Sequence, residues 1–361
     1  MAFSDTKIRD YYRFRLPFDH HRHSNSDWMT HSHKLMPDIS EVDKSIIEPF
    51  PAELSPSGFD LRVGRYIAKS DVLYTHLTYG DFFSMNPTFL HEGKSYTFLH
   101  DKDGGAVYYV LSHEKFNLPN GLEMIIDARS TTGRVGGMCH GVGSGVEGEK
   151  IIALQPFSFP ITVTSGKTSL AQAIIRFKGT EFIDYKTLAG NTEGISLHKN
   201  GRDVFDESLK PNGLIISFSS HLVYCAKDCK EPIDMDVERE IDPNLYFEVI
   251  EGNSNFKMDA RTFYLTGTRE VIGLENICGR ISRESDISGT GLWSHFAGFV
   301  QPGFSGGLTL ECYSLNNRMI RDGEPAGFVI FDKVDGKVGK GYNGAYQNQT
   351  VPKLPKMFKD F

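Results

Sequence analysis

From about residue 46 to its end, the chain consists of short apolar runs separated by glycine, proline and asparagine. The strand-like runs are FDLRVGRYI, AVYYVLSHEKF, GLEMIIDA, IIALQPFSFPITV, GLIISFSSHLVY, LYFEVIEG, TFYLTGTREVIGL, LTLECYSL and AGFVIFDKV. Helical periodicity is scarce: SLAQAIIRF is the best amphipathic candidate, and a strand fits it as well. With 36 Gly, 26 Phe and 15 Tyr, the composition favours strands and tight turns. We therefore expect an all-β fold with few short helices.

A faint internal repeat divides this part of the chain. Three short motifs of the first half have echoes in the second half at a spacing of about 150 residues, which is the size of one domain. The motif pairs are Leu54–Gly58 with Leu209–Gly213, Ala128–Ser130 with Gly279–Ser282, and Ser165–Lys167 with Asp322–Glu324. We expect a polar extension over residues 1–45 and two diverged β-domains over residues 46–190 and 191–361. Chance similarity between turn sequences is the alternative.

Charge and composition exclude several classes of protein. The net charge of −7 argues against a general nucleic-acid-binding surface, although a few arginines and backbone N–H groups suffice to bind a phosphate ester. No apolar run reaches the roughly 18 residues of a membrane span, and the N-terminal MAFSDTKIRDYYRF lacks the apolar stretch of a signal peptide. Five cysteines argue against a disulfide framework. We expect a cytoplasmic protein that binds neither nucleic acid nor membranes.

The polar extension holds a group of histidines, His20, His21, His23, His31 and His33. Imidazoles are good Zn²⁺ ligands, but the spacing here is irregular and no cysteine or carboxylate completes a ligand set. A solvated or partner-covered tail is the stronger interpretation.

Two further motifs are weak indications of metal binding. Neither Cys225 with Cys229 nor Cys139 with His140 has a second ligand pair at zinc-like spacing, so buried or incidental thiols are the stronger interpretation. The chain also lacks the H-x-E and P-C-x-x-C pattern of zinc-dependent nucleobase deaminases. If this chain deaminates a base, it should activate water without zinc.

Residues 127–136 form the first cluster of side chains with chemical potential. The segment DARSTTGRVG follows the apolar strand GLEMII and is rich in arginine, hydroxyl side chains and glycine. Glycine lets backbone N–H groups turn inward, hydroxyls donate hydrogen bonds, and arginine forks onto phosphate oxygens. The segment suits a phosphate-binding loop, and a polar solvated loop is the alternative.

Residues 294–311 form the second cluster. The sequence SHFAGFVQPGFSGGLTLE reads as a strand, a Pro-Gly turn and a strand, which predicts a β-hairpin. Thr309 and Glu311 share one face of the second strand because side chains alternate along it. If that face lines a pocket, Glu311 is a buried carboxyl with a raised pKa, suited to moving protons near neutral pH. If it faces water, Glu311 is an edge-strand charge.

The C-terminal segment contains GYNGAYQNQ over residues 341–349, followed by Lys353, Lys356 and Lys359. Glycine, asparagine and tyrosine are typical of a mobile segment that orders over a ligand. A frayed basic tail is the alternative.

These segments, in this order, resemble the dCTP deaminase family and its relatives, the trimeric dUTPases. The opening LSPSGFDLRVG over residues 54–64 is similar to the family's first strand, and residues 129–134 resemble its phosphate and catalytic motif. Residues 297–311 resemble its nucleoside-binding hairpin, and residues 346–349 its C-terminal phosphate-covering arm. The match covers residues 46–361, with the doubled length of a two-repeat subgroup. The resemblance implies two tandem dUTPase-like β-clip barrels.

The resemblance also implies a role for each matching residue. Glu311 would act as general base and then acid in the hydrolytic deamination of dCTP to dUTP and ammonia. Ser130 and Arg134 would orient the attacking water and support the charge that builds up at C4. The substrate contacts would come from Arg129, Thr131, Tyr346 and Gln349 to the triphosphate, from Ala297 and Gly298 to the cytosine edge, and from Gln301 and Phe304 to the deoxyribose. Mg²⁺ would be bound through the triphosphate, with no zinc and no metal site of the protein's own.

Neither half of the chain carries the full catalytic set. In the first half, residues 151–155 occupy the place of Glu311 and include no carboxylate. In the second half, residues 280–284 occupy the place of the Ser130 motif and disrupt it. We therefore expect one composite site per pair of repeats, with Ser130 and Arg134 from the first repeat and Glu311 from the second. Either the two halves of one chain or two chains of a homo-oligomer could supply these groups.

Gln301 departs from the related dUTPases, which have an aspartate here that helps to orient water at the α-phosphate. A carboxamide cannot act as a base, so we expect dUTP rather than dUMP as the product. A dUTPase or bifunctional deaminase–diphosphatase is one alternative, and a nucleotide-sensing protein without turnover is another. The expected partners are dCTP and dUTP, and the sequence leaves feedback inhibition by dTTP open.

Overall fold

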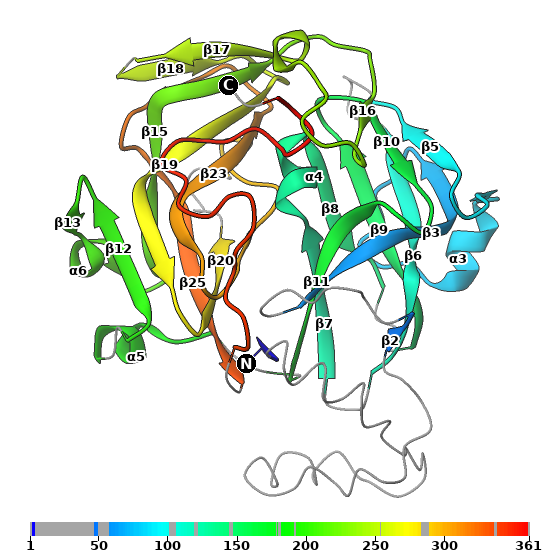
Figure 1. Ribbon diagram of the computed structural model, residues 1–361, viewed down its shortest axis with the longest axis horizontal. Coiled ribbons are helices and arrows are strands. Elements are labelled where there is room, and N and C mark those ends of the chain that lie inside the picture. The colour runs from blue at the N-terminus through cyan, green and yellow to red at the C-terminus, as the bar shows by residue number, and fades with distance from the viewer. Residues whose placement is uncertain are drawn as a thin grey trace, which may run out of the picture.

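The computed structural model describes residues 2–3, 47–49, 58–100, 106–118, 122–143, 147–177, 179, 182–190, 193–252, 254–282, 289–335 and 338–359. Strands dominate it, and they form two β-barrel lobes that lie side by side (Figure 1). The expected all-β class with few short helices is confirmed. The histidine group and residues 54–57 lie outside the described residues, and the domain boundaries stay a prediction.

The first lobe contains nine strands and two short helices in the described residues. They are β3 (Phe59–Ser70), α3 (Tyr79–Ser84), β4 (Thr88–Phe89), β5 (Ser95–Phe98), β6 (Val107–Asn117), β7 (Leu122–Ala128), α4 (Ser130–Arg134), β8 (Gly137–Gly141), β9 (Glu147–Pro156), β10 (Ile161–Thr164) and β11 (Ser169–Phe177). Two short strands precede them, β1 (Ala2–Phe3) and β2 (Ile47–Glu48).

The second lobe repeats this pattern with additions at its start. Its elements are α5 (Tyr185–Gly190), β12 (Ile195–Lys199), β13 (Arg202–Asp203), α6 (Phe205–Ser208), β14 (Leu209–Lys210), β15 (Gly213–Ala226), β16 (Ile233–Asp234), η2 (Pro243–Leu245), β17 (Phe247–Glu251), β18 (Asn255–Met258), β19 (Phe263–Leu274), β20 (Ile277–Ser282), β21 (Leu292–Trp293), β22 (Phe299–Val300), β23 (Ser305–Ser314), β24 (Arg318–Arg321) and β25 (Pro325–Asp335).

The two lobes share one strand topology. In the first lobe, β6 lies between β3 and β9, and β11 lies between β3 and β7, all antiparallel. In the second lobe, β19 lies between β15 and β23, and β25 lies between β15 and β20 in the same way. The β6–β9 and β19–β23 ladders even shift register at matching points, between Leu111 and Lys115 and between Gly267 and Val271.

A buried glutamate accompanies this register shift in each lobe. Glu114 accepts a hydrogen bond from Arg62 N at 2.9 Å, and Glu270 accepts one from Ser217 N at 2.7 Å. Both carboxylates are buried, and each supplies an acceptor where the ladder is irregular. Because the same contact recurs at equivalent positions, the two lobes are diverged copies rather than a chance similarity of turns.

The glycines of two of the three motif pairs seen in the sequence lie at structurally equivalent positions. A Cβ on Gly58 or Gly213 would lie 2.1 or 2.5 Å from a backbone oxygen of the neighbouring strand, β11 or β25. Both positions therefore require glycine. Gly166 and Gly323 occupy matching turns, with φ of 77° and 82°, where glycine is also favoured.

The third pair, Ala128–Ser130 with Gly279–Ser282, is out of register. Ile126 on β7 and Ile281 on β20 pair with equivalent positions of β11 and β25, so the two isoleucines are counterparts. The expectation that residues 280–284 match the Ser130 motif is therefore wrong in register. The counterpart of that motif begins after Ser282, outside the described residues.

The segment SLAQAIIRF forms strand β11 and not a helix. It pairs with β7 along one edge and with β3 along the other, so it is a central strand. Residues 170–175 are all buried. A strand that is covered on both faces reads as a continuous apolar run, which explains why its sequence periodicity was ambiguous.

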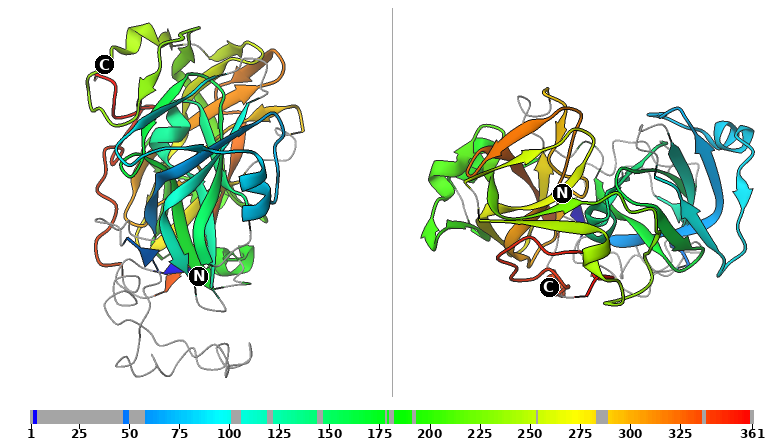
Figure 2. Two further views of the ribbon diagram at one scale, coloured as in Figure 1. Left: turned by 90° about the vertical axis from the view of Figure 1, so that its right-hand side faces the viewer. Right: turned by 90° about the horizontal axis from the view of Figure 1, so that it is seen from above.

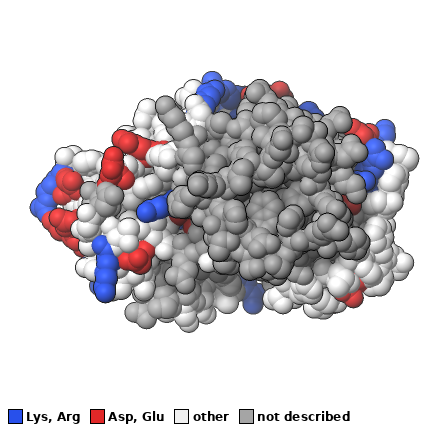
Figure 3. Space-filling view, turned by 90° about the horizontal axis from the view of Figure 1, so that it is seen from below, with Lys and Arg blue, Asp and Glu red and all other residues white. Residues whose placement is uncertain are grey.

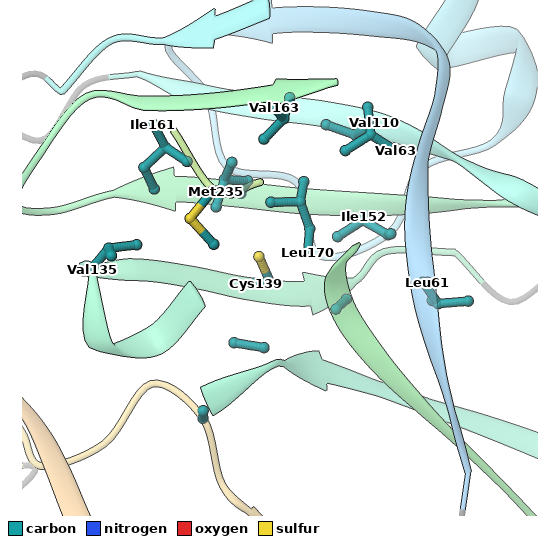
Figure 4. Packing of buried hydrophobic residues seen from close by; sticks show 14 of the residues in the cluster. Leu61, Val63, Val110, Val135, Cys139, Ile152, Ile161, Val163, Leu170 and Met235 are labelled. Atoms are coloured by element: carbon teal, nitrogen blue, oxygen red, sulfur yellow. The ribbon is translucent and has the colours of Figure 1, made fainter. Parts of the chain in front are cut away.

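Several segments tie the lobes together. β16 of the second half pairs in parallel with β10 of the first, and Met235 lies in the first lobe's core beside Ile161 (Figure 4). β1 pairs with both β11 and β25. The C-terminal segment runs along the junction, as the views in Figure 2 show, and ends with Phe358 packed on the rings of Tyr246 and Phe247.

No helix in the described residues is long and apolar enough to cross a membrane. The same residues include no group of three or more His, Cys, Asp or Glu side chains that could hold a metal ion. The five cysteines are free thiols. On the face seen from below, described basic and acidic side chains are interspersed around the rim (Figure 3).

Candidate active site

A cavity of about 160 Å³ lies at the junction of the two lobes, and we call it the seam cavity. Helix α4 of the first lobe forms one wall of this cavity, and the hairpin of residues 297–311 of the second lobe forms another. The C-terminal segment covers both walls. Every predicted site residue except Gly298 lines it. These residues are Arg129, Ser130, Thr131, Arg134, Ala297, Gln301, Phe304, Glu311, Tyr346 and Gln349.

Glu311 lies on β23 with 1% of its surface exposed. Its Oε2 accepts hydrogen bonds from Phe296 N at 3.1 Å and Ala297 N at 3.3 Å. Burial raises the pKa of Glu311 to about 7, although the Arg134 guanidinium and the two N–H groups act to lower it. A carboxyl that titrates near neutral pH can accept a proton and return it. The pocket-facing interpretation of Glu311 is confirmed, and the edge-strand interpretation is wrong.

Helix α4 approaches Glu311 through a glycine. A Cβ on Gly133 would lie 3.0 Å from Ala297 Cβ and 3.2 Å from Glu311 Cδ, so a side chain at this position would require Ala297 or the Glu311 carboxyl to shift. On the other side of the helix, the buried Thr132 hydroxyl donates to Leu170 O at 2.8 Å. Glycine and threonine together fix α4 of the first repeat against the carboxyl of the second.

Arg134, at the end of α4, is 4% exposed. Its Nη1 donates to Lys353 O at 2.7 Å, its Nη2 donates to Gln349 Oε1 at 3.4 Å, and its Cζ lies 3.5 Å from the centre of the Tyr346 ring. Its Nε is buried with no hydrogen-bond partner among the described residues. A buried cation with an unused donor beside a cavity can hold an oxygen of a bound molecule.

The start of α4 supplies further polar groups to the cavity. Arg129 precedes the helix, and its Nη2 lies 2.9 Å from Asp60 Oδ2. Ser130 is the first helical residue and is half-buried. Thr131 Oγ1 lies 3.4 Å from the Tyr346 hydroxyl. The solvated-loop interpretation of residues 127–136 is wrong, because this segment forms a wall of the cavity.

The hairpin contributes both apolar and amide groups. Phe304 is buried, with its ring centre 5.7 Å from that of Tyr342, and the buried Gln301 precedes the Pro-Gly turn. Gly298 differs from the expectation. Its N donates to Asp127 Oδ2 at 3.2 Å and its O accepts from Ile281 N at 2.8 Å, so both its backbone groups bind protein and it lies off the cavity.

The C-terminal segment is fixed at both ends and is not a frayed tail. At one end Tyr342 N donates to Pro302 O at 2.8 Å, and at the other Phe358 is 2% exposed. Between them Gln349 Nε2 donates to Gly307 O at 2.5 Å, and Gly307 N donates to Gln349 O at 2.8 Å. The segment therefore lies along the start of β23 and over the cavity.

One chain brings Ser130, Arg134 and Glu311 to a single cavity. The strand register identifies the first-lobe counterpart of Glu311, because Glu311 pairs with Leu265 as Ala153 pairs with Tyr109. The prediction that residues 151–155 occupy the place of Glu311 without a carboxylate is therefore confirmed, with Ala153 at that place.

Some cavity residues were not assigned from the sequence. They are Asp60, Gln172, Ile281, Phe299, Val300, Leu308, Thr309 and Tyr342. Asp60 and Gln172 are paired across β3 and β11, and each is a polar residue within an apolar strand. A polar residue that interrupts an apolar strand was the sequence feature that could have identified Asp60 and Gln172 as site residues.

Comparisons with known proteins agree with this arrangement. The sequence model of one family, described as dCTP deaminase-like, matches residues 32–177 and again residues 192–334. Two matches to the same family are what a tandem duplication produces.

Several relatives carry the name "dCTP deaminase, dUMP-forming". The protein of Persephonella marina is 28% identical over 135 residues, which are 36% of this chain and 75% of the relative. The protein of Streptomyces coelicolor is 29% identical over 175 residues, which are 45% of this chain and 91% of the relative. Each relative therefore corresponds to less than half of this chain.

Among solved structures, the 2′-deoxycytidine 5′-triphosphate deaminase of Agrobacterium tumefaciens superposes with a TM-score of 0.68. The superposition covers 81% of this chain and 94% of that chain, at 18% sequence identity. At this identity the likeness concerns the fold alone.

Proposed function

This chain belongs to the dCTP deaminase-like family, and we propose that the seam cavity is the active site of a dCTP deaminase that forms dUTP and ammonia. One observation carries the proposal. A buried carboxyl with a pKa of about 7 from the second repeat lines the same cavity as a hydroxyl and a guanidinium from the first. Binding alone needs no proton carrier, so this arrangement favours turnover over nucleotide sensing.

In the proposed reaction, Glu311 takes a proton from water as the water oxygen bonds to C4 of cytosine. The C4=N3 bond becomes single, and Glu311 passes the proton taken from water to N3. Glu311 then takes the proton of the new C4 hydroxyl and delivers it to the 4-amino group; the C4–N4 bond breaks as C4=O forms, and ammonia leaves. Burial of Glu311 matches this double role, because a carboxyl that titrates near pH 7 is neither too weak a base nor too weak an acid.

Ser130 and Arg134 are proposed to act on the water and on the charge at C4. Both line the seam cavity with Glu311. The buried Nε of Arg134 offers a donor for an oxygen atom. Donors already placed before the reaction stabilise developing charge without reorganisation.

The triphosphate is proposed to lie along Arg129, Thr131, Tyr346 and Gln349, with Mg²⁺ bound through its oxygens as part of the substrate. Ala297 is proposed to face the cytosine edge, and Gln301 and Phe304 the deoxyribose. Among the described residues that line the cavity there is no Cys or His. We therefore propose a zinc-independent reaction, because zinc sites in proteins are built mainly from those ligands.

A second candidate is a deaminase that also cleaves the triphosphate to give dUMP. The names of the relatives favour it, since they are called dUMP-forming. Gln301 in the cavity wall favours dUTP as the product, because a carboxamide cannot act as a base toward water at the α-phosphate. Formation of a homo-oligomer and feedback inhibition by dTTP stay predictions from the resemblance.

The test is to incubate the purified protein with dCTP and Mg²⁺ and to measure ammonia, dUTP and pyrophosphate separately. The proposal expects ammonia and dUTP in equal amounts without pyrophosphate. Equal ammonia and pyrophosphate with dUMP would establish the second candidate. Binding of dCTP without release of ammonia would contradict both and indicate a nucleotide sensor.

A further inference from the structure

A second, larger cavity of about 630 Å³ lies on the other side of the peptide segment that holds Glu311. His295 and Phe296 line this cavity, whereas Ala297 lines the seam cavity. Residues 295–297 thus form a thin wall between the two hollows. Asp127, the last charged residue of β7, lines the larger cavity and faces this wall from the first lobe.

Two carboxylates, one from each repeat, bind three consecutive N–H groups, two in this wall and one in the residue that follows it. Glu311 Oε2 accepts from Phe296 N and Ala297 N, at 3.1 and 3.3 Å. Asp127 Oδ2 accepts from Gly298 N at 3.2 Å. The Asp127 bond crosses between lobes, so it fixes the peptide of the second repeat relative to the first repeat, which supplies Ser130 and Arg134.

The Asp127 bond also sets the direction of a carbonyl. In a trans peptide the N–H and C=O groups point in opposite directions. Since Gly298 N–H points to Asp127, the carbonyl of the same peptide unit, Ala297 C=O, is turned away from Asp127. Ala297 lines the seam cavity and Asp127 does not, which makes this carbonyl an acceptor for a donor on a bound base.

We propose that Asp127 is a positioning residue for base recognition: it holds the Ala297 carbonyl in the orientation that accepts a hydrogen bond from the 4-amino group of cytosine. This rests on the proposed function. It also gives discrimination between substrate and product, because uracil presents an oxygen at that position and two acceptors cannot share a hydrogen bond. Without Asp127 the peptide can rotate and present Gly298 N–H, a donor that suits uracil.

The surroundings of Asp127 support a dedicated role. Its Oδ1 accepts from Ala128 N at 2.9 Å, which orients the carboxylate. A Cβ on Gly298 would lie 3.2 Å from Asp127 Oδ2 and 3.3 Å from Ile281 O, so glycine permits this close approach. The register of β7 and β20 places Ser282 at the equivalent position of the second repeat, so the carboxylate is specific to the repeat that faces the hairpin.

The test is Asp127→Asn, which keeps the shape of the side chain and removes its charge, with Asp127→Ala as a second variant. The kcat/KM for dCTP and the inhibition constant of dUTP are measured for each. For Asp127→Asn we expect kcat/KM for dCTP to fall by about tenfold to a hundredfold, as for the loss of a hydrogen bond to a charged group. The inhibition constant of dUTP should stay the same or decrease. The preference of the site for dCTP over dUTP should therefore become smaller.

The matched control is Glu123→Gln, which neutralises another carboxylate of β7. Glu123 pairs with Arg176 at 2.7 Å and lines neither cavity. The Glu123→Gln variant should leave both kcat/KM for dCTP and the inhibition constant of dUTP in the same ratio as in the wild-type protein. Melting temperatures of all variants show whether each is folded.

Equal weakening of dCTP and dUTP by Asp127→Asn would overturn the inference, since Asp127 would then only support the cavity. No change in either constant would overturn it as well. If the wild-type protein does not turn over dCTP, the proposed function fails separately. In that case calorimetry gives the affinities for dCTP and dUTP, and the ratio of these affinities in the wild-type protein and in Asp127→Asn tests the role of Asp127.

Discussion

Gly133 of the first repeat lies so close to Glu311 of the second that an added Cβ would be 3.2 Å from the carboxyl carbon. The contact explains why a glycine stands between the hydroxyl cluster and Arg134. The site depends on this contact, because neither repeat has both parts of it.

Replacing Gly133 should therefore impair the site more than the fold. For Gly133→Val we expect kcat/KM for dCTP to fall by about a hundredfold, because a displacement of about 1 Å between reacting groups has that effect. Gly190→Val is the control, since a Cβ at Gly190 would meet nothing within 4 Å. Normal activity of Gly133→Val with an unchanged melting temperature would show that α4 need not touch Glu311.

Glu311→Gln should retain nucleotide binding and lose deamination by about a hundredfold or more, the usual contribution of a general acid–base group. The amide keeps the acceptor for Phe296 N and Ala297 N but cannot carry a proton. Calorimetry with dCTP and an ammonia assay measure the two properties. The exposed Glu251, replaced in the same way, serves as control. Wild-type rates in Glu311→Gln would remove Glu311 from the mechanism.

The raised pKa of Glu311 also predicts the direction of a pH effect on stability. Its folded pKa of about 7 lies above its ordinary value of 4.5, so the folded state binds the proton more tightly. This contribution to stability is full below about pH 4.5 and is lost as the pH rises through about 7. Relative to Glu311→Gln, the wild-type free energy of unfolding should fall by about 3 kcal/mol across that range. Parallel pH dependences of the two proteins would contradict the raised pKa.

The pH dependence of the reaction should have the opposite slope. The free enzyme needs Glu311 ionised to accept a proton from water, so kcat/KM for dCTP should fall as the pH decreases below about 7. A rate that stays level down to pH 5 would assign the base to another group.

Tyr346 should contribute more through its ring than through its hydroxyl. The ring lies 3.5 Å from Arg134 Cζ, whereas the hydroxyl contacts Thr131 only at 3.4 Å. We expect Tyr346→Ala to lower kcat/KM by about tenfold, in line with a desolvated cation–π contact, and Tyr346→Phe to have a smaller effect. Steady-state kinetics of both variants make the comparison. Equal losses would assign the effect to the hydroxyl instead.

The sequence predicted the site better than it predicted the details of the strands. Glu311 and Thr309 were correctly placed on one face of their strand, because the alternation of side chains along a strand is a local property. Whether that face was buried could not be read locally, because α4 and residues 342–353, far away in sequence, cover it. Gly298 was misassigned for a similar reason, since its partners Asp127 and Ile281 come from other strands.

The errors of register have the same origin. The echo between Ala128–Ser130 and Gly279–Ser282 was a similarity of letters, while the pairing of β20 with β25 shifts the true counterpart along the chain. Asp60 and Gln172 were not assigned because they lie within strands whose apolar runs dominated the pattern. A polar pair on two adjacent central strands becomes visible as a site only when the pairing is known.

The central claim is that one chain supplies both halves of one active site, and complementation tests it most directly. Chains with Ser130→Ala and chains with Glu311→Gln are produced together, and their dCTP deamination is compared with that of the wild-type protein. We predict that the mixture remains as inactive as each variant alone, because every chain then lacks one group of its own cavity. Recovery of a substantial fraction of wild-type activity would show that Ser130 and Glu311 meet across different chains and would contradict this account.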